Sequence, residues 1–356
     1  FLTLMHQEGV TVMFGNPGTT ELPIMDALTK QSDVGYVLGL QESIVVAMAD
    51  GYARASGNLV ACNVHVAPGL GNAIGALYTA NVSGTPMIIT AGQQEQGHGL
   101  MEPALYAPLV PIASPVVKWA VEVTRIEDLP RILHRAAKVA RTAPSGPVFI
   151  SLPGDILNDE AALDLGQLTM VNTRTRPSDD VLESLARRLL AAKNPMILAG
   201  TELVGGNAGF NEAARLAEIL GCPVYQQTVP HGAHFPSEHP AFMGALSRNQ
   251  AEVREILSSY DLLISLGAEL LTMSVYSPVD PLPPATKVVQ IGLRDWEMGK
   301  NWAADFAVRS DIKETLECLN PVLEKIDGAD RAAEAQASLA TYAHPNWRQQ
   351  RLTKRA

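Results

Sequence analysis

The chain has 356 residues, 47% hydrophobic and 18% charged, which is enough for about two globular domains. Its formal net charge of −10 disfavours nucleic acid and anionic membranes as partners, and no apolar run approaches the ~20 residues that a membrane-spanning helix needs. Three cysteines lie far apart in apolar surroundings and without metal-ligand spacing: Cys62, Cys222 and Cys318. This pattern indicates reduced, buried thiols in a cytoplasmic protein.

Residues 1–165 alternate between strand-like and helical segments, with turn residues between them. Strands are predicted at 10–14, 34–38, 59–65, 86–91, 116–123 and 147–152. Helices are predicted at 20–29, 42–56, 70–82 and 126–142. Apolar strands that alternate with helices are typical of a parallel sheet covered on both faces. The polar stretch from Gln93 to Met101 is either the border of a pocket or a simple connection.

Residues 166–178 lose this alternation and are predicted to be a linker. The alternation restarts at Ser178, which we expect to cap a helix. Further strands are predicted at 195–199, 223–227, 261–266 and 286–291, and helices at 208–221, 249–259 and 311–325. The sequence thus predicts an α/β protein with two consecutive doubly wound parallel-sheet domains and helices on both faces, the second spanning 179–326. Residues 327–356 are Ala-rich and charged, and are expected to form a partly helical tail.

A glycine pattern in the second domain raises the possibility of a dinucleotide site. Gly200, Gly205, Gly206 and Gly209 follow a predicted strand and precede a helix. Their spacing does not match G-x-G-x-x-G, and no acidic residue stands at a convincing end of the next strand. The pattern is therefore only a weak indication of nucleotide binding.

Three successive strand-to-helix corners in the first domain carry polar residues that could do chemistry. Thr19 lies in the first corner, Glu42 opens the second helix, and His65 follows the third strand. The carboxyl ends of parallel strands share one sheet edge, where ligands bind in α/β folds. Each residue also has a structural explanation: Thr19 as a helix cap, Glu42 as an acid that offsets the helix dipole, and His65 as a donor to backbone groups.

Taken together, the corners resemble the pyrimidine-binding domain of thiamine-diphosphate-dependent enzymes. The matching segments keep the family's order across residues 1–155: FGNPGTTELP, LGLQESIVVAMADGYARASG, VHVAPGLGNAIGAL and ITAGQQ. The resemblance is closest to benzoylformate decarboxylases and more distant to acetolactate synthases. The second domain resembles the family's central domain, with weaker motifs.

The resemblance implies decarboxylation of a 2-oxo acid: addition of the cofactor's C2 ylide, loss of carbon dioxide and protonation of an enamine. Glu42 matches the acid that faces the aminopyrimidine ring, and its apolar neighbours favour the neutral carboxyl group. His65 matches a histidine that transfers protons, which suits a group that titrates near neutral pH. Thr19 matches a serine that contacts the substrate carboxylate.

The same resemblance assigns residues near the cofactor. It implies that Asn16, Pro17 and Gly18 approach the cofactor ring through the backbone, where glycine permits a close approach. Asn72 matches an asparagine near the cofactor, and His239 aligns with a second active-site histidine. Two further histidines, His231 and His234, lie in the same loop as His239. Without cysteines or paired acids nearby, these three histidines are a weak indication of a metal site.

In this family a C-terminal domain with a GDG…Asn signature holds the diphosphate and Mg²⁺, and the subunits form dimers or tetramers. No such signature occurs here, so we expect that domain to follow in a longer chain, with a separate subunit as the alternative source, and we expect the chain to be inactive alone. The alternatives are an acetolactate-synthase-type carboligase, with FAD as a minor possibility in the central domain, and a non-catalytic assembly module. Glu42 argues against the module, because an idle site does not need an acid in an apolar corner.

Overall fold

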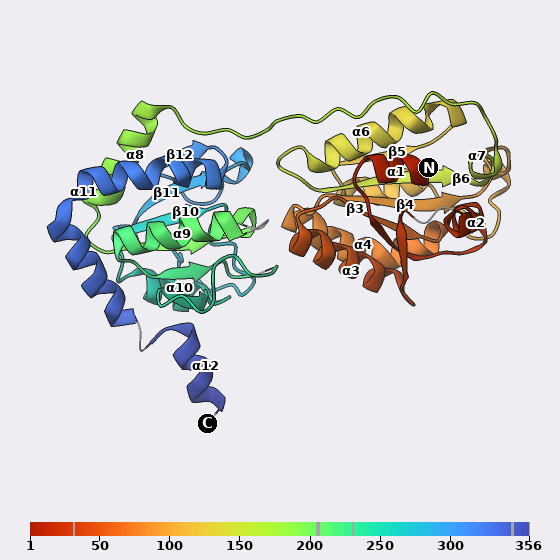
Figure 1. Ribbon diagram of the computed structural model, residues 1–356. Coiled ribbons are helices and arrows are strands. Elements are labelled where there is room, and N and C mark those ends of the chain that lie inside the picture. The colour runs from red at the N-terminus through yellow and green to blue at the C-terminus, as the bar shows by residue number, and fades with distance from the viewer. Residues whose placement is uncertain (31–32, 204–206, 230, 343–344, 356) are drawn as a thin grey trace. The chain divides into compact units, whose positions relative to one another are not determined.

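The computed structural model describes residues 1–30, 33–203, 207–229, 231–342 and 345–355. The chain divides into two compact units, Phe1–Thr173 and Arg174–Ala356. Each unit is built on a six-stranded sheet in which every neighbouring pair of strands is parallel, with helices on both faces (Figure 1). The predicted fold class is confirmed.

The sheet of unit 1 has the strand order β2-β1-β3-β4-β6-β5. Its strands are β1 (Val12–Asn16), β2 (Gly35–Leu38), β3 (Val60–Val64), β4 (Met87–Gln93), β5 (Trp119–Glu122) and β6 (Pro147–Pro153). From β1 the chain first moves outward to β2 and then returns past β1 to β3. The order therefore reverses between β1 and β3, and ligands of open α/β sheets bind at such a reversal, outside the carboxyl ends of the strands.

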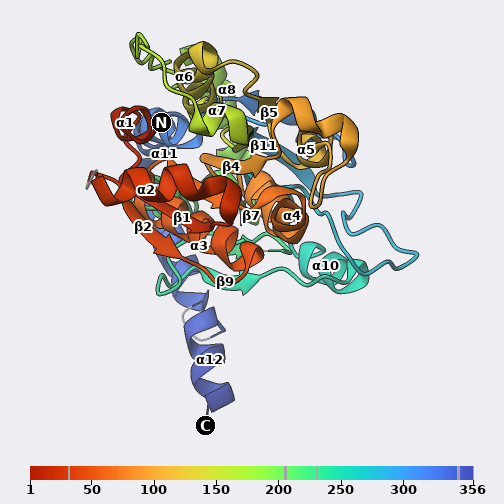
Figure 2. The same ribbon diagram turned by 90° about the vertical axis from the view of Figure 1, so that its right-hand side faces the viewer.

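Helices cover both faces of this sheet (Figure 2). One face carries α3 (Glu42–Ser56), α4 (Val66–Ser83) and α5 (Leu109–Ala113). The other face carries α1 (Leu2–Gln7), α2 (Leu22–Lys30), α6 (Leu129–Arg141) and α7 (Gly154–Asn158). Each face thus has its own hydrophobic core, as expected for a sheet that is buried on both sides.

Helix α3 shows why these segments fold as they do. Val45, Ala49 and Ala53 follow one another at intervals of four and are all buried against the sheet. Full burial of a valine or leucine side chain is worth about 1.5–3 kcal/mol. The helix ends at Gly57, whose φ of +75° is the left-handed conformation that suits glycine. This packing fixes the start of α3, and with it Glu42, at the sheet edge.

Unit 2 has the strand order β12-β11-β10-β7-β8-β9. Its strands are β7 (Pro195–Ala199), β8 (Val224–Gln226), β9 (Phe242–Ala245), β10 (Leu262–Leu266), β11 (Lys287–Gly292) and β12 (Phe306–Arg309). Its helices are α8 (Asp179–Ala191), α9 (Asn207–Leu220), α10 (Gln250–Leu257), α11 (Ile312–Tyr342) and α12 (Trp347–Arg355). Helices α8, α9 and α11 share the core on one face, and α10 packs on the other.

Several predicted boundaries were wrong. Helix α4 begins at Val66 and not at residue 70. Pro68 lies in its first turn, where backbone N–H groups have no intrahelical partner, so a proline is tolerated there. Helix α11 passes through Pro321 and reaches Tyr342. The edge strands β9 and β12 have only four residues each and were missed. Ser178 is the N-cap of α8, but its hydroxyl bonds to the Asp180 carboxylate instead of to a backbone N–H group.

The presence of glycine at position 200 is explained by packing, without a bound nucleotide. Gly200 follows β7 and packs against the backbone after β10, where a Cβ at this position would lie 2.1 Å from the Cα of Ala268. Gly205 and Gly206 lie outside the described residues. No helix within the described ranges is long and apolar enough to cross a membrane.

A buried ion cluster ties the segment after α7 to α6. Glu8 is only 5% exposed and contacts Arg141 Nη1 at 2.7 Å and His134 Nδ1 at 2.6 Å. The other ring nitrogen of His134 lies 2.7 Å from the Leu165 carbonyl oxygen. Burial lowers the pKa of His134, but the hydrogen bonds to Glu8 and Leu165 and the charge of Glu8 raise it, and the net pKa lies above its ordinary value. The ring therefore binds best as an imidazolium that donates from both nitrogens.

We predict that His134→Ala destabilises the protein in a pH-dependent way. Because the folded pKa is raised, the stabilisation is complete below the unfolded pKa and disappears as the pH rises through the folded value. Hydrogen bonds to charged groups are worth about 1.5–3 kcal/mol, the expected loss at about pH 6. Urea unfolding from about pH 6 to about pH 9 measures this loss, with the exposed His98→Ala as the control. A pH-independent loss would contradict the imidazolium assignment.

Candidate active site

The carboxyl ends of β1, β3 and β4 bring the corner residues together. Asn16 ends β1, His65 directly follows β3, and Gly92 is the second-to-last residue of β4. Strands β1 and β3 are paired, with Asn16 beside Val64. The sheet thus places two of the predicted site residues, Asn16 and His65, at the reversal of strand order, where α/β folds bind ligands.

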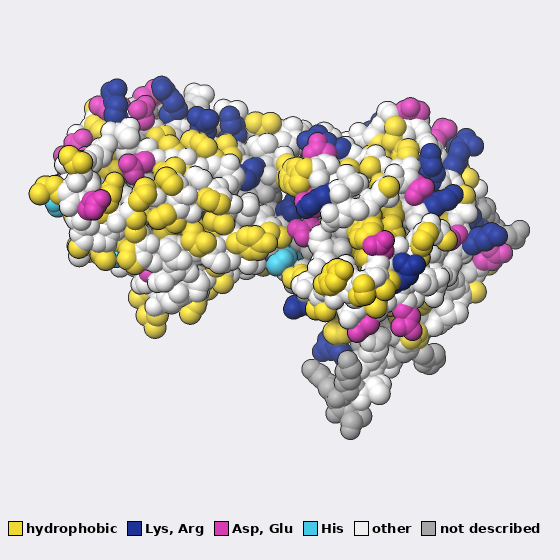
Figure 3. All heavy atoms as spheres, turned by 180° about the vertical axis from the view of Figure 1, so that it is seen from behind, with side chains coloured by type: hydrophobic (Ala, Val, Ile, Leu, Met, Phe, Trp, Pro, Cys, Tyr) yellow, Lys and Arg dark blue, Asp and Glu magenta, His cyan; other side chains and the backbone are white. Residues whose placement is uncertain are grey.

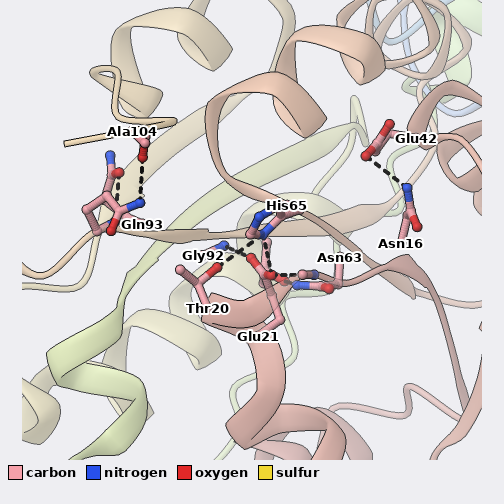
Figure 4. Close-up of polar contacts among 12 residues, drawn as sticks. Asn16, Thr20, Glu21, Glu42, Asn63, His65, Gly92, Gln93 and Ala104 are labelled. Carbon is pink, nitrogen blue, oxygen red and sulfur yellow. Dashed lines mark hydrogen bonds and ion pairs between the residues drawn. The ribbon is translucent and has the colours of Figure 1, made fainter. Parts of the chain in front are cut away.

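Glu42 is the first residue of α3 and is held by side chains from two other corners. The residue as a whole is 7% exposed. Asn16 Nδ2 donates to its Oε1 at 3.0 Å (Figure 4), and Asn72 Nδ2 donates to its Oε2 at 2.9 Å. Among the described residues Glu42 forms no ion pair, and its two side-chain donors are neutral amides.

The helix end itself is capped by a different side chain. Gln41 Oε1 accepts hydrogen bonds from the N–H groups of Ser43 at 2.7 Å and Ile44 at 3.2 Å. Capping of these N–H groups is thus supplied without Glu42. An acid that merely offset the helix dipole would not need burial or two amide donors, so the dipole explanation accounts for only part of the arrangement.

A second polar group forms around His65 (Figure 4). Its Nδ1 lies 2.8 Å from Oε2 of Glu21 and 3.3 Å from Oγ1 of Thr20. Glu21 is fully buried, and its oxygens also accept from the backbone N–H groups of Gly18 at 2.8 Å and Gly92 at 2.7 Å. His65 is thus bonded to a carboxylate, unlike a strand-end histidine that is satisfied by backbone groups.

The corner that carries His65 is tight. A Cβ at Gly18 would lie 2.3 Å from Nδ1 and Cε1 of the imidazole ring, so the ring rests directly on the glycine. The next residue, Val66, has a φ of +41°, which is rare for a β-branched side chain and costs on the order of 1–3 kcal/mol. Val66 is completely buried, and its surroundings maintain this conformation.

A cavity of about 430 Å³ lies beyond the end of β4. Gln93 and Gln94 brace the loop that borders it, by donating to the carbonyl oxygens of Ala107 at 2.9 Å and Ala104 at 2.8 Å. Its lining comes from Gln93–Gln96, Gly99, Tyr106, Pro108–Pro111 and Glu122. Of the two interpretations left open for this polar stretch, the border of a pocket is the one the structure favours.

The structure brings some predicted site residues together and leaves others apart. Asn16, Glu42 and Asn72 form one hydrogen-bonded group, and Gly18 touches the His65 ring. Thr19 is exposed and makes none of these contacts. Its contact with a substrate carboxylate, like that of Pro17 with the cofactor, stays a prediction.

His239 lies in unit 2, where it has partners of its own. Its Nε2 is 3.3 Å from Glu218 Oε1, its Nδ1 accepts from the Ala241 N–H group at 3.2 Å, and its ring meets that of Phe235 edge to face. These contacts give His239 a local structural role, and its catalytic role stays a prediction.

Sequence reasoning missed Glu21 and Thr20. Glu21 stands at a position where a capping box places an acid, and its side chain does accept the Gly18 N–H as such an acid would. Its bonds to His65 and Gly92 come from residues 44 and 71 positions away. The FGNPGTTELP segment carried the signal for both residues, but only the fold shows which of the adjacent threonines faces the histidine.

Two family models match the chain. The thiamine pyrophosphate enzyme N-terminal TPP binding domain matches residues 1–103, and the thiamine pyrophosphate enzyme central domain matches residues 182–319. Together these ranges span more than half of the chain. The chain belongs to the thiamine pyrophosphate enzyme family. The expected family is confirmed.

Among the relatives within this thiamine pyrophosphate enzyme family, benzoylformate decarboxylase of Pseudomonas aeruginosa is 34% identical over 319 residues. The acetolactate synthase large subunit of Buchnera aphidicola is 28% identical over 324 residues. The two alignments cover 89% of this chain but only 60% and 56% of the relatives. The chain therefore spans less than two thirds of the length of these curated relatives.

Two solved structures of the thiamine pyrophosphate enzyme family resemble this chain with the same TM-score. The thiamine diphosphate-dependent 4-hydroxybenzoylformate decarboxylase of Rhodococcus jostii has a TM-score of 0.81 at 31% identity, and covers 90% of this chain. Benzoylformate decarboxylase of Polynucleobacter necessarius has a TM-score of 0.81 at 33% identity, with the same coverage. This chain covers 61% and 60% of those two chains.

We predict that Gly18→Ala displaces the His65 ring, because the new methyl group would overlap it. Overpacking of this kind costs about 1–3 kcal/mol of stability. Gly71→Ala is the matched control: Gly71 lies exposed in α4, and its new methyl group would have no neighbouring atom within 4 Å. Alanine there should stabilise the helix by about 0.5–1 kcal/mol. Urea unfolding measures both effects. Equal stabilities of the two variants would refute the close contact.

Proposed function

We propose that this chain forms the cofactor-activating part of a thiamine-diphosphate-dependent 2-oxo acid decarboxylase. The observation that carries the proposal is Glu42, a buried carboxyl group at the sheet edge with two amide donors and no ion pair among the described residues. The relatives named as benzoylformate and 4-hydroxybenzoylformate decarboxylases support this reaction class. The acetolactate-synthase alternative has weaker support, from relatives at lower identity.

The residues at the sheet edge fit the pyrimidine end of the cofactor. We propose that Glu42 hydrogen-bonds a ring nitrogen, with Asn16 and Asn72 holding its carboxyl group in place. Gly69 passes close by, since a Cβ there would lie 3.2 Å from Glu42 Oε1, and so keeps the corner compact. Thiamine diphosphate, when bound, supplies a carbon nucleophile that also accepts the electron pair released with carbon dioxide.

His65 is proposed to carry the proton transfers on the substrate side. Its side chain is 24% exposed, so one edge of the ring can meet a substrate while the other is bonded to Glu21. The cavity beyond β4 is proposed to accept the side chain of the 2-oxo acid, and Thr19 its carboxylate. Pockets of several hundred Å³ are the usual size for small-molecule sites.

The proposal extends to the assembly and to Mg²⁺. Large apolar side chains of unit 1 are exposed near the site, among them Leu38, Leu40 and Ile44, and hydrophobic side chains cover broad areas of the face drawn in Figure 3. Exposed apolar patches mark interaction sites. We therefore expect a homodimer or homotetramer by sedimentation. Because the family holds Mg²⁺ in its C-terminal domain, we also expect the full-length protein to lose cofactor binding when Mg²⁺ is chelated. A monomer, or binding without Mg²⁺, would contradict this part of the proposal.

A cytoplasmic location is proposed from the thiols. The three cysteines form no disulfide, and burial raises the pKa of Cys62 and Cys222, which makes these thiols unreactive. Buried free thiols are usual in a reducing compartment.

The experiment that tests the proposed function uses Glu42→Gln in the full-length protein. Glutamine keeps the shape but cannot supply a carboxylic acid, and acid–base roles are worth about 10²–10⁴-fold. We therefore expect carbon dioxide release from benzoylformate, with thiamine diphosphate and Mg²⁺, to fall by that factor. Glu127→Gln is the control, because it makes the same chemical change at an exposed carboxylate before α6. Full turnover in Glu42→Gln would exclude the proposed role of Glu42. If the protein without substitutions releases no carbon dioxide from benzoylformate or pyruvate, the proposed decarboxylation is excluded.

A further inference from the structure

Glu21 lies at the centre of the second polar group and accepts hydrogen bonds at both oxygens. Oε1 faces the Gly92 N–H group at 2.7 Å, and Oε2 faces the Gly18 N–H group at 2.8 Å. The side chain is completely buried. Backbone N–H groups can only donate, and hydrogen bonds of this kind favour the ionised carboxylate. Glu21 is therefore an anion whose charge is stabilised by the backbone.

This anion determines where the proton of a neutral His65 ring resides. Nδ1 of His65 lies 2.8 Å from Oε2. An ionised carboxylate accepts only, so Nδ1 must carry the hydrogen and donate it. In neutral imidazole the other nitrogen is then an acceptor. Among the described residues Nε2 has no hydrogen-bond partner, which leaves it available to a ligand.

The surroundings of the ring prevent an exchange of the two edges. The Nδ1 edge rests on Gly18, where a Cβ would lie 2.3 Å away, and Thr20 Oγ1 stands 3.3 Å from the same nitrogen. A flipped ring would place a carbon atom against Glu21 Oε2 and leave a buried charge with one partner fewer. Loss of one partner from a buried charged hydrogen bond is costly.

We propose that Glu21 is a positioning residue that holds His65 in the Nδ1–H tautomer and directs Nε2 towards the substrate. The proposal rests on the proposed function in that His65 is the proton-transfer group. In the neutral ring Nε2 accepts a proton, and the resulting imidazolium, stabilised by Glu21, returns it from the same atom. A carboxylate that orients a catalytic histidine through Nδ1 acts in the same way in hydrolytic triads.

The tautomer can be measured without activity. The chain is labelled with nitrogen-15 histidine, and the two ring nitrogens of His65 are observed by long-range proton–nitrogen correlation at a pH where the ring is neutral. The signals are assigned by their absence in His65→Gln. We expect Nδ1 to have the chemical shift of a protonated nitrogen and Nε2 that of an unprotonated one. The reverse pattern would overturn the proposal, even if Glu42→Gln behaved as expected.

Two variants separate the carboxylate from its neighbour. Glu21→Gln removes the charge with little change of shape, and should shift the tautomer towards Nε2–H or mix the two forms. Thr20→Val removes the hydroxyl at 3.3 Å and should leave the tautomer unchanged. A tautomer that follows Thr20 and not Glu21 would refute the assignment. If Glu21→Gln does not fold, the nitrogen-15 measurement of the His65 tautomer in the chain without substitutions still tests the proposal.

In the full-length protein the same variant has a kinetic signature. Glu21→Gln should lower kcat and change its pH profile, while the affinity for thiamine diphosphate stays within about twofold, because Glu42 and its two amide partners are untouched. A purely structural role would instead weaken cofactor binding and leave the shape of the pH profile unchanged. That result would overturn the positioning role.

Discussion

The parallel pairing of β1 with both β2 and β3 is the constraint on which the rest of unit 1 depends. Because the three strands run parallel, the turns that follow them all open at the same edge of the sheet. Asn16 can then reach Glu42, and Gly18 can touch His65. A hydrogen-bonded site is thereby assembled from segments that are far apart in the sequence.

Three nearly buried carboxyl groups in this unit meet the same physical problem with different partners. Burial of a charge is unfavourable unless it is paired or well hydrogen-bonded. Glu8 is paired with the cationic Arg141 and His134, Glu21 with backbone N–H groups and a histidine, and Glu42 with two neutral amides. Cations and N–H donors, those of asparagine side chains included, all stabilise the ionised form of a carboxyl group. Each of the three carboxyl groups thus has a donor at both oxygens, although the donors differ in kind.

How far the sequence predicts this protein depends on where the information lies. Glu42 and His65 were found because each stands at a strand end or a helix start, which local patterns reveal, and Asn16 and Asn72 were found through the resemblance of their segments to the family. Glu21 was missed because two of its partners are backbone N–H groups, which leave no mark in the side-chain pattern.

The same reasoning applies to the fold. The buried strands were predicted within a few residues, since their apolar runs are distinctive. The edge strands β9 and β12 were missed because they are short and partly exposed. The start of α4 was misplaced because Pro68 and Gly69 resemble a turn, although the first turn of a helix tolerates both. Which of Thr19 and Thr20 faces His65 depends on the turn geometry, which two adjacent threonines cannot specify.

The way Glu21 is held has an evolutionary consequence. Its two backbone donors belong to residues 18 and 92, and every amino acid except proline keeps such an N–H group. Side-chain mutation can crowd these positions but cannot delete the donors. The donors that hold Glu21 are therefore independent of side-chain identity, whereas a donor to Glu42 is lost whenever Asn16 or Asn72 is replaced.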